Sequence, residues 1–231
     1  MRIRPVGAHA LLLDVAAPPA GAVAAPPAGD VAGPAEQDIA ADGDVAGRVE
    51  AWRAELTRRR DLGELAAVEI VPAAATVLLD GVPDPETTAR RIAGWHPRPV
   101  TADTAAAQVE VPVTYDGPDL PLVAEHWATT VATVVQRLTG TEFRVAFCGF
   151  APGFAYLTGL PAELALPRLP TPRPRVPAGS VALAGPYAGI YPSTSPGGWL
   201  LVGRTTMALF DVVADPPTRL TPGTRVRLVA S

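Results

Sequence analysis

The sequence predicts an α+β protein, with a small N-terminal α/β domain over residues 1–142 and a β-rich domain over residues 143–231. Helical and strand-like hydrophobic patterns alternate in the first part, whereas the later apolar runs are short and separated by proline and glycine, as in barrels and sandwiches. The first part holds 11 arginines and 20 acids, and the second holds 8 arginines and 3 acids. The two parts therefore differ in charge as well as in pattern.

The composition excludes several classes of protein. With 231 residues and 48% hydrophobic content the chain can bury real cores, and a net charge of −4 predicts neither nucleic-acid nor anionic-membrane binding. All 19 basic residues are arginine, which excludes a lysine Schiff base and a phosphate-loop lysine. Any bound anion must therefore meet arginine, hydroxyl or backbone N–H groups.

The cysteine count and the apolar runs predict a cytoplasmic protein with no membrane partner. Cys148 is the only cysteine, so no internal disulfide can form. His9 and Asp14 interrupt the apolar stretch that a signal peptide would need. No run approaches the ~20 apolar residues that a membrane helix requires.

Strands and helices alternate at the start of the chain. Residues 2–15 predict a strand, residues 45–60 a helix, residues 68–82 two short strands, and residues 84–95 a helix with an acidic first turn. Residues 16–47 contain 22 alanine, proline or glycine residues among 32, and no positive charge. We expect a disordered insertion there, because small side chains bury little surface and prolines block regular structure.

The first part ends in a strand and a helical region. Residues 108–116 alternate as a half-buried strand does. Residues 119–140 carry apolar positions at three- and four-residue spacings, which predicts one helix or two consecutive helices. Two helices would break near Ala128, with Thr129 or Thr130 as the second cap.

The second part contains repeated short apolar runs separated by turn signals. This spacing predicts a β-barrel or a sandwich. The expected strands are "SVALAG" (180–185), "GWLLVGRT" (198–205), "MALFDVV" (207–213) and "RVRLVA" (225–230).

Proline and glycine are densest in three segments, residues 149–161, 167–185 and 188–205. Proline fixes φ and glycine permits positive φ, so these segments predict loops of predetermined shape. We expect Pro196 and Gly197 to set a type II-like turn, and Gly198 to relieve crowding where Trp199 enters its strand. Rigid corners of a barrel would explain the same composition without a binding role.

Polar groups on these loops define a candidate site for a small-molecule substrate. If the loops converge at one barrel mouth, they form a pocket with aromatic walls and arginine forks that suit a carboxylate or a phosphate. The anion-binding candidates are Arg168, Arg173, Arg175, Ser180, Tyr191, Ser195 and Arg204. The residues expected to shape the pocket are Phe150, Pro152, Gly153, Phe154, Tyr156, Pro177, Gly179, Pro196, Gly197, Gly198 and Trp199.

The second part lacks groups that other chemistries need. All three histidines, His9, His96 and His126, precede residue 143, so a Ser–His dyad within the barrel is excluded. No His/Cys cluster exists, and we expect no metal site. Cys148 lies in an apolar run, where a free cysteine is usually a small buried hydrophobe. The sequence assigns no catalytic residue.

Three motifs carry a resemblance to a known family. They read "GFAPGFAYLTGLP", "TPRPRVPAGSVALAG" and "GIYPSTSPGGWLLVGRT", and they occur in the family's order. From about Glu110 to the C-terminus the chain resembles the KipI family, also called allophanate hydrolase subunit 1 or the 5-oxoprolinase B subunit (PxpB). A weaker similarity covers "RIRPVGAHALLLDV".

The resemblance implies a cyclophilin-like β-barrel after the N-terminal domain, and work in a complex. Such proteins act with a KipA-type (PxpC) and a LamB/YcsF-type (PxpA) subunit in an ATP-dependent 5-oxoprolinase, which opens 5-oxo-L-proline to L-glutamate. Amide activation by phosphate needs positive groups around the developing anion. Arg173, Arg175 and Arg204, with Ser180 and Ser195 as hydrogen-bonding partners, are the candidates for that role.

Relatives in the same family imply two alternatives. One is a regulatory protein that inhibits a sensor histidine kinase, and the other is a carboxyltransferase-like part of a urea carboxylase or allophanate system. Prolyl isomerase activity is suggested only by the barrel shape, and fold does not determine function.

Overall fold

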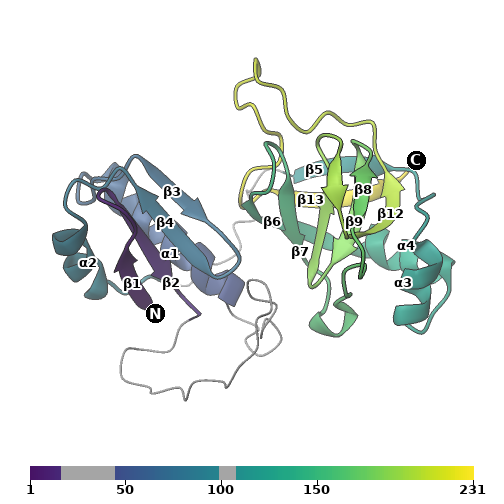
Figure 1. Cartoon of the computed structure of the whole chain (residues 1–231), viewed down its shortest axis with the longest axis horizontal. Coiled ribbons are helices and arrows are strands. Elements are labelled where there is room, and N and C mark those ends of the chain that lie inside the picture. The colour runs from purple at the N-terminus through teal and green to yellow at the C-terminus, as the bar shows by residue number, and fades with distance from the viewer. Residues whose placement is uncertain (17–44, 99–107) are drawn as a thin grey trace. The chain divides into compact units, whose positions relative to one another are not determined.

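The computed structural model describes residues 1–16, 45–98 and 108–231, and it divides the chain into two compact units, residues 1–102 and 103–231 (Figure 1). The expected α+β class, with a small N-terminal α/β domain before a barrel, is confirmed. Most of the expected insertion, residues 16–47, lies outside the described residues. Its last three residues begin a helix and were wrongly included in it.

The first unit is a four-stranded antiparallel sheet with two helices. Its strand order is β1-β2-β4-β3. The bounds are β1 Arg2–Pro5, β2 Ala10–Asp14, α1 Val45–Asp61, β3 Glu69–Pro72, β4 Thr76–Asp80 and α2 Pro85–Ala93. The single strand expected over residues 2–15 is in fact a hairpin of β1 and β2, and Gly7 adopts a φ of 68° in the connection.

One face of this sheet is covered by helix side chains. Leu11 and Leu13 of β2 alternate into the core, where they meet Trp52 and Leu56 of α1. These are the positions at which strand and helix periodicities place apolar residues on one side. Helix α2 begins at the cap Asp84, whose carboxylate accepts the backbone N–H of Thr87 at 3.0 Å.

The second unit is a nearly closed seven-stranded barrel. Its strand order is β12-β9-β10-β7-β6-β13-β5, and only the β5–β13 pair is parallel. The bounds are β5 Gln108–Val113, β6 Glu142–Cys148, β7 Ala155–Thr158, β9 Ser180–Ala184, β10 Tyr187–Ile190, β12 Leu200–Arg204 and β13 Arg225–Ala230. Thr114 and Arg204 join the two outer strands through mutual backbone hydrogen bonds of 2.9 Å.

The remaining elements lie outside the seven-stranded sheet. Strands β8 Arg173–Val176 and β11 Ser195–Gly197 form a separate two-stranded ribbon. Helices α3 Leu120–His126 and α4 Val131–Gly140 pack against β12 and β13, and η1 covers Ala162–Leu164.

The second unit begins at residue 103, well before residue 143, where we expected the second domain to begin. Strand β5 pairs along its whole length with β13, and α3 and α4 cover the barrel. These elements alternate along the sequence like those of the first unit. Their assignment to the barrel depends on long-range pairing that the sequence pattern does not show.

The helical region breaks as expected. Ala128 has a φ of 46°, and the Thr130 side chain caps α4 by accepting the backbone N–H of Thr133 at 3.2 Å. Among the helices of the described ranges, none is both long and apolar enough to span a membrane.

One expected strand is wrong. Residues 207–213 form no named strand, and only Phe210 makes an isolated bridge, with Thr218. Val212 and Val213 are 79% and 87% exposed. The run is apolar enough for a strand, but it lacks a neighbouring strand along which to pair.

Candidate functional site

Two of the three proline- and glycine-rich segments, residues 149–161 and 188–205, supply rings to one group, and Val176, Ala182 and Ala184 of the third pack against it. We call this group the aromatic cluster, and its ring centroids lie 4.3 to 6.2 Å from their neighbours. Its members are Phe147, Phe150, Phe154, Tyr156, Tyr187, Tyr191 and Trp199. Phe154 lies at the centre, with centroids 5.3 Å from Tyr191 and 5.5 Å from Trp199. Four of the rings, Phe150, Phe154, Tyr156 and Trp199, are residues that we expected to shape the pocket.

The cluster requires a glycine where we expected a turn. Neither Gly197 nor Gly198 is among the glycines with positive φ, so the type II-like turn is wrong. Residues 195–197 instead form β11. A Cβ on Gly197 would overlap the Tyr191 hydroxyl, whereas a Cβ on Gly198 would meet its nearest atom, Leu169 O, at an ordinary 3.6 Å. The crowding that we assigned to Gly198 therefore lies at Gly197.

A tight turn presents Phe150 at the edge of the cluster. Phe150 has a φ of 70° and is 63% exposed, and its ring lies 5.3 Å from that of Phe154. Pro152 and Gly153 follow, and Gly153 has a φ of 83° with the Phe210 Cβ only 2.7 Å from where its own Cβ would lie. A non-glycine residue with positive φ is uncommon, so this loop holds Phe150 in an unusual conformation.

Arg173 is committed to an internal ion pair. Its Nη2 donates to Oδ1 of Asp119 at 2.7 Å, and its Nη1 donates to the Trp199 carbonyl at 3.4 Å. The second Asp119 oxygen accepts the backbone N–H of Leu201 at 2.6 Å. Arg173 therefore stabilises the loop that carries Trp199, and its expected role as an anion-binding residue is not supported. We did not predict Asp119, which the sequence shows only as a residue at a helix start.

Two other predicted polar residues also have structural partners. Ser180 is buried and donates to the Pro177 carbonyl at 2.8 Å. A Cβ on the adjacent Gly179, whose φ is 80°, would overlap the carbonyl oxygen of Thr205. Arg204 pairs with Asp116 at 2.8 Å, and both side chains are exposed. The Ser180 carbonyl accepts the backbone N–H of Tyr191 at 2.9 Å, so Ser180 lies next to the aromatic cluster, but its hydroxyl is already bonded.

The charges of Arg168 and Arg173 both act on the cluster, and among the described residues Arg168 has no ion-pair or hydrogen-bond partner. Burial raises the pKa of Tyr156 above its usual value, and the Arg168 guanidinium opposes that shift. Burial likewise raises the pKa of Tyr187 and of Tyr191, so all three phenols are protonated at neutral pH. An exposed guanidinium next to neutral hydroxyls can hold an oxyanion by charge and hydrogen bonds.

Arg175 and Ser195 remain available for binding. Arg175 is exposed, and its side chain forms no ion pair or hydrogen bond in the part of the chain that the structure describes. The Ser195 Oγ is buried and has no hydrogen-bond partner among the described residues. Ser195 lies opposite Val176, a member of the hydrophobic core next to the aromatic cluster.

Cys148 is a poor candidate for a nucleophile. The Cys148 Sγ donates to the Leu220 carbonyl at 3.2 Å, and burial raises the pKa of the thiol. A raised pKa disfavours the reactive thiolate. Within residues 1–16, 45–98 and 108–231, no group of three His, Cys, Asp or Glu side chains could hold a metal ion.

Two further cavities are lined by residues that the structure describes. One, of about 540 Å³, lies between the end of α4 and residues 160–164. The other, of about 400 Å³, belongs to the first unit and is lined by α1 and the segment after α2. None of the residues predicted for the barrel site lines either cavity. Three arginines line the second cavity, which we did not predict from the sequence.

Fold and site together define a two-domain α+β protein whose barrel exposes arginine beside clustered aromatic rings. The chain belongs to the family described as carboxyltransferase domain, subdomain C and D, whose model matches residues 1–220. The resemblance to the KipI family, which includes the B subunits of 5-oxoprolinase, is confirmed.

Curated relatives of this chain are B subunits of 5-oxoprolinase. The chain is 43% identical over 142 residues to the one from Escherichia coli O157:H7, a match covering 60% of this chain and 65% of that protein. It is 45% identical over 124 residues to the one from Bacillus subtilis (strain 168), covering 52% of each. The matched region thus spans about half to two thirds of these curated relatives.

Solved structures are similar to this chain over most of its length. The crystal structure of TTHA0988 is 36% identical with a TM-score of 0.66, covering 82% of this chain and 38% of that one. The conserved uncharacterized protein PH0987 from Pyrococcus horikoshii is 28% identical with a TM-score of 0.52, covering 100% and 97%. The urea amidolyase of K. lactis is 17% identical with a TM-score of 0.67, and the match covers 99% of this chain and 15% of the amidolyase chain. This match shows a similar fold alone.

Proposed function

We propose that this chain is the B subunit of an ATP-dependent 5-oxoprolinase, which acts with a KipA-type and a LamB/YcsF-type subunit in the cytoplasm to open 5-oxo-L-proline to L-glutamate. The observation that carries the proposal is that two of the family's three motifs supply rings of the aromatic cluster, while Val176, Ala182 and Ala184 of the third pack against those rings. Relatives at 43% and 45% identity are named as B subunits of 5-oxoprolinase. The chain would contribute substrate binding.

The chemistry of the cluster suits this substrate. A lactam with a carboxylate presents a small ring that packs on aromatic faces and an anion that pairs with a guanidinium. Arg168 supplies the charge, and the protonated hydroxyl of Tyr156 can donate to a carbonyl or carboxylate oxygen. Phe150, exposed at the edge, would cover the bound ring. These residues bind and orient the substrate, and we assign none of them a proton-transfer role.

A nucleotide is a poor fit to the described barrel residues. The chain has no lysine, and the backbone N–H of Gly179 donates to the Tyr191 carbonyl at 2.7 Å instead of facing a ligand. Arg173 is occupied by Asp119. We therefore assign no ATP contact to these barrel residues.

ADP release by this chain, co-purified with its KipA-type and LamB/YcsF-type partners, tests the proposal. Release that requires 5-oxo-L-proline and all three chains is the expected result. An assembled complex that releases no substrate-dependent ADP would overturn it. Omitting each protein in turn provides the control, because background ATPase activity would persist without the missing chain.

The family description favours one alternative. A carboxyltransferase-like role in urea or allophanate metabolism agrees with that description, although the K. lactis proteins resemble this chain in fold alone. Urea-dependent rather than 5-oxoproline-dependent turnover would select it. Stoichiometric inhibition of a sensor histidine kinase, with no small substrate, would instead select the regulatory role.

A further inference from the structure

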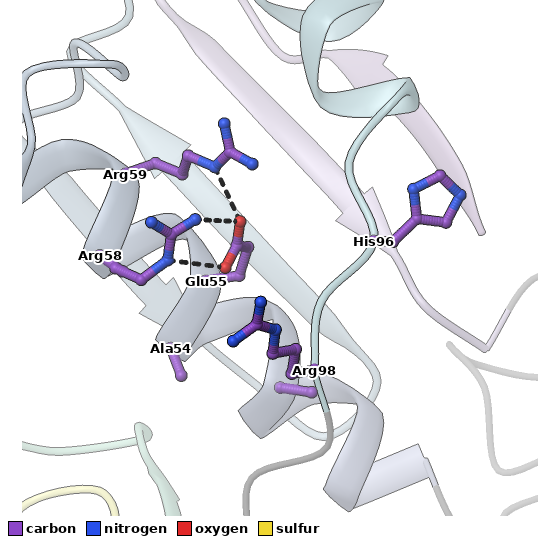
Figure 2. Close-up of a pocket in the computed structure, with 7 residues that line it drawn as sticks. Ala54, Glu55, Arg58, Arg59, His96 and Arg98 are labelled. Atoms are coloured by element: carbon purple, nitrogen blue, oxygen red, sulfur yellow. Dashed lines mark hydrogen bonds and ion pairs between the residues drawn. The ribbon is translucent and has the colours of Figure 1, made fainter.

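The cavity of about 400 Å³ in the first unit has an unusual lining (Figure 2). Arg58 and Arg59 come from the last turn of α1, and Arg98 comes from the segment after α2. Figure 2 shows Arg98 reaching toward the side of α1 that carries Glu55. Three guanidinium groups and one carboxylate, that of Glu55, thus line the same cavity.

Glu55 holds two of these guanidiniums in place. It accepts from Arg58 Nη2 at 2.7 Å and Nε at 3.0 Å, and from Arg59 Nε at 2.7 Å. The hydrogen bond from Arg58, followed by that from Arg59, lowers the pKa of Glu55 to about 2, so the carboxylate stays charged at neutral pH. One anion therefore orients two cations side by side.

Arg59 is fixed further by two neighbours. Its guanidinium lies 4.5 Å from the centre of the Trp95 ring, and its Nη1 donates to Glu64 at 2.6 Å. Stacking and ion pairing restrict the side chain, so little of its conformational entropy remains to be lost when a ligand binds. An oriented arginine is a better anion receptor than a free one.

The charges around the cavity do not cancel. Arg58, Arg59 and Arg98 carry three positive charges against the two carboxylates of Glu55 and Glu64, which leaves one net positive charge. Arg98 forms no ion pair or side-chain hydrogen bond within the described part of the chain, so its five N–H donors are open. Arginines at a helix C-terminus are expected to complement the helix dipole. That reason applies to Arg58 and Arg59 but leaves Arg98, from another segment, unexplained.

We propose that this cavity binds a small polyanion, such as a molecule carrying a phosphate group or several carboxylates. Arg98 and the free donors of Arg58 and Arg59 would hold the anion, and Ala51 and Ala54 leave the space for it. Phosphate and carboxylate share the oxygen pattern that guanidinium groups recognise. The site lies within the first unit and does not depend on the function proposed for the barrel.

Titration calorimetry on the full chain at low salt, with pyrophosphate and with citrate as probes, tests this site. We expect saturable one-to-one binding of at least one probe. Binding of pyrophosphate would indicate a phosphate ligand, and binding of citrate would indicate a ligand with several carboxylates. Arg98→Gln should weaken that binding about tenfold, the value of a charge-assisted hydrogen bond. This variant is expected to fold, because Arg98 is exposed.

Arg60→Gln is the matched control. Like Arg98→Gln, this variant removes one positive charge. Arg60 lies in the last turn of α1 but does not line the cavity, and its Nε lies 3.6 Å from Asp61 Oδ1. Its affinity should equal that of the unmodified chain. Equal weakening by both variants would indicate general electrostatic attraction and overturn the site, as would heats that do not saturate with either probe.

Discussion

Arg173 and Asp119 lie 54 positions apart in the chain, yet Arg173 Nη2 and Asp119 Oδ1 are 2.7 Å apart. Asp119 is buried, and its other oxygen accepts the backbone N–H of Leu201 at the start of β12. One carboxylate therefore ties together the start of α3, β8 and β12. This pair stabilises the loop that presents Trp199 to the aromatic cluster.

Replacing Asp119 should destabilise the barrel strongly. Asp119→Ala leaves a partly buried guanidinium without its partner, and we expect the free energy of unfolding to fall by about 3 kcal/mol. The control is Asp116→Ala, which breaks the exposed pair with Arg204 and should cost about 0.5 kcal/mol. Urea denaturation measures both variants. Equal losses would show that Asp119 is no more important than a surface acid.

Adding a methyl group at Gly197 should disturb the cluster. The new Cβ of Gly197→Ala would overlap the Tyr191 hydroxyl, so the ring must move, and we expect a loss of about 1–3 kcal/mol in unfolding free energy. Gly198→Ala, where the nearest atom is 3.6 Å away, should change stability by less than about 1 kcal/mol. Thermal unfolding compares the two. A larger loss at Gly198 would contradict the role given to Gly197.

Two exposed arginines should affect turnover of the assembled complex. Arg168→Ala removes the charge beside the cluster, and we expect kcat/KM for 5-oxo-L-proline to fall at least about tenfold without unfolding. Arg175→Ala should also reduce turnover, as its sequence motif predicts. Arg227→Ala, an exposed arginine on β13, is the control and should behave as the unmodified chain does. Unchanged turnover in either test variant would remove that residue from the site.

Acid should selectively remove the contribution of Glu55 to stability. Its pKa is lowered to about 2 in the folded chain, below the ordinary 4.5, so its ion pairs stabilise the fold above about pH 4.5 and are lost as the pH falls toward 2. The difference in unfolding free energy between the unmodified chain and Glu55→Gln should therefore shrink across that window. A difference that stays constant would show that Arg58 and Arg59 do not hold the carboxylate charged.

Local patterns predicted many of the elements. The break at Ala128 and the cap at Thr130 follow from helical spacing and from a side chain that bonds its own backbone, both of which act within a few residues. The run at 207–213 misled us because β propensity requires a neighbouring strand, and Val213 has none. The hairpin within residues 2–15 was missed because one glycine, Gly7, reverses the chain.

The sequence by itself determined the α+β class, the family motifs and the aromatic and arginine side chains that these motifs carry. Only the tertiary structure decided that Arg173 forms an ion pair with Asp119, whereas Arg168 is exposed near the aromatic cluster. It also decided that Arg98 and Arg58 line the same cavity. The physical reason is distance along the chain. Side chains that are tens of residues apart meet only after strand pairing and helix packing have set their positions, and no local pattern contains that information.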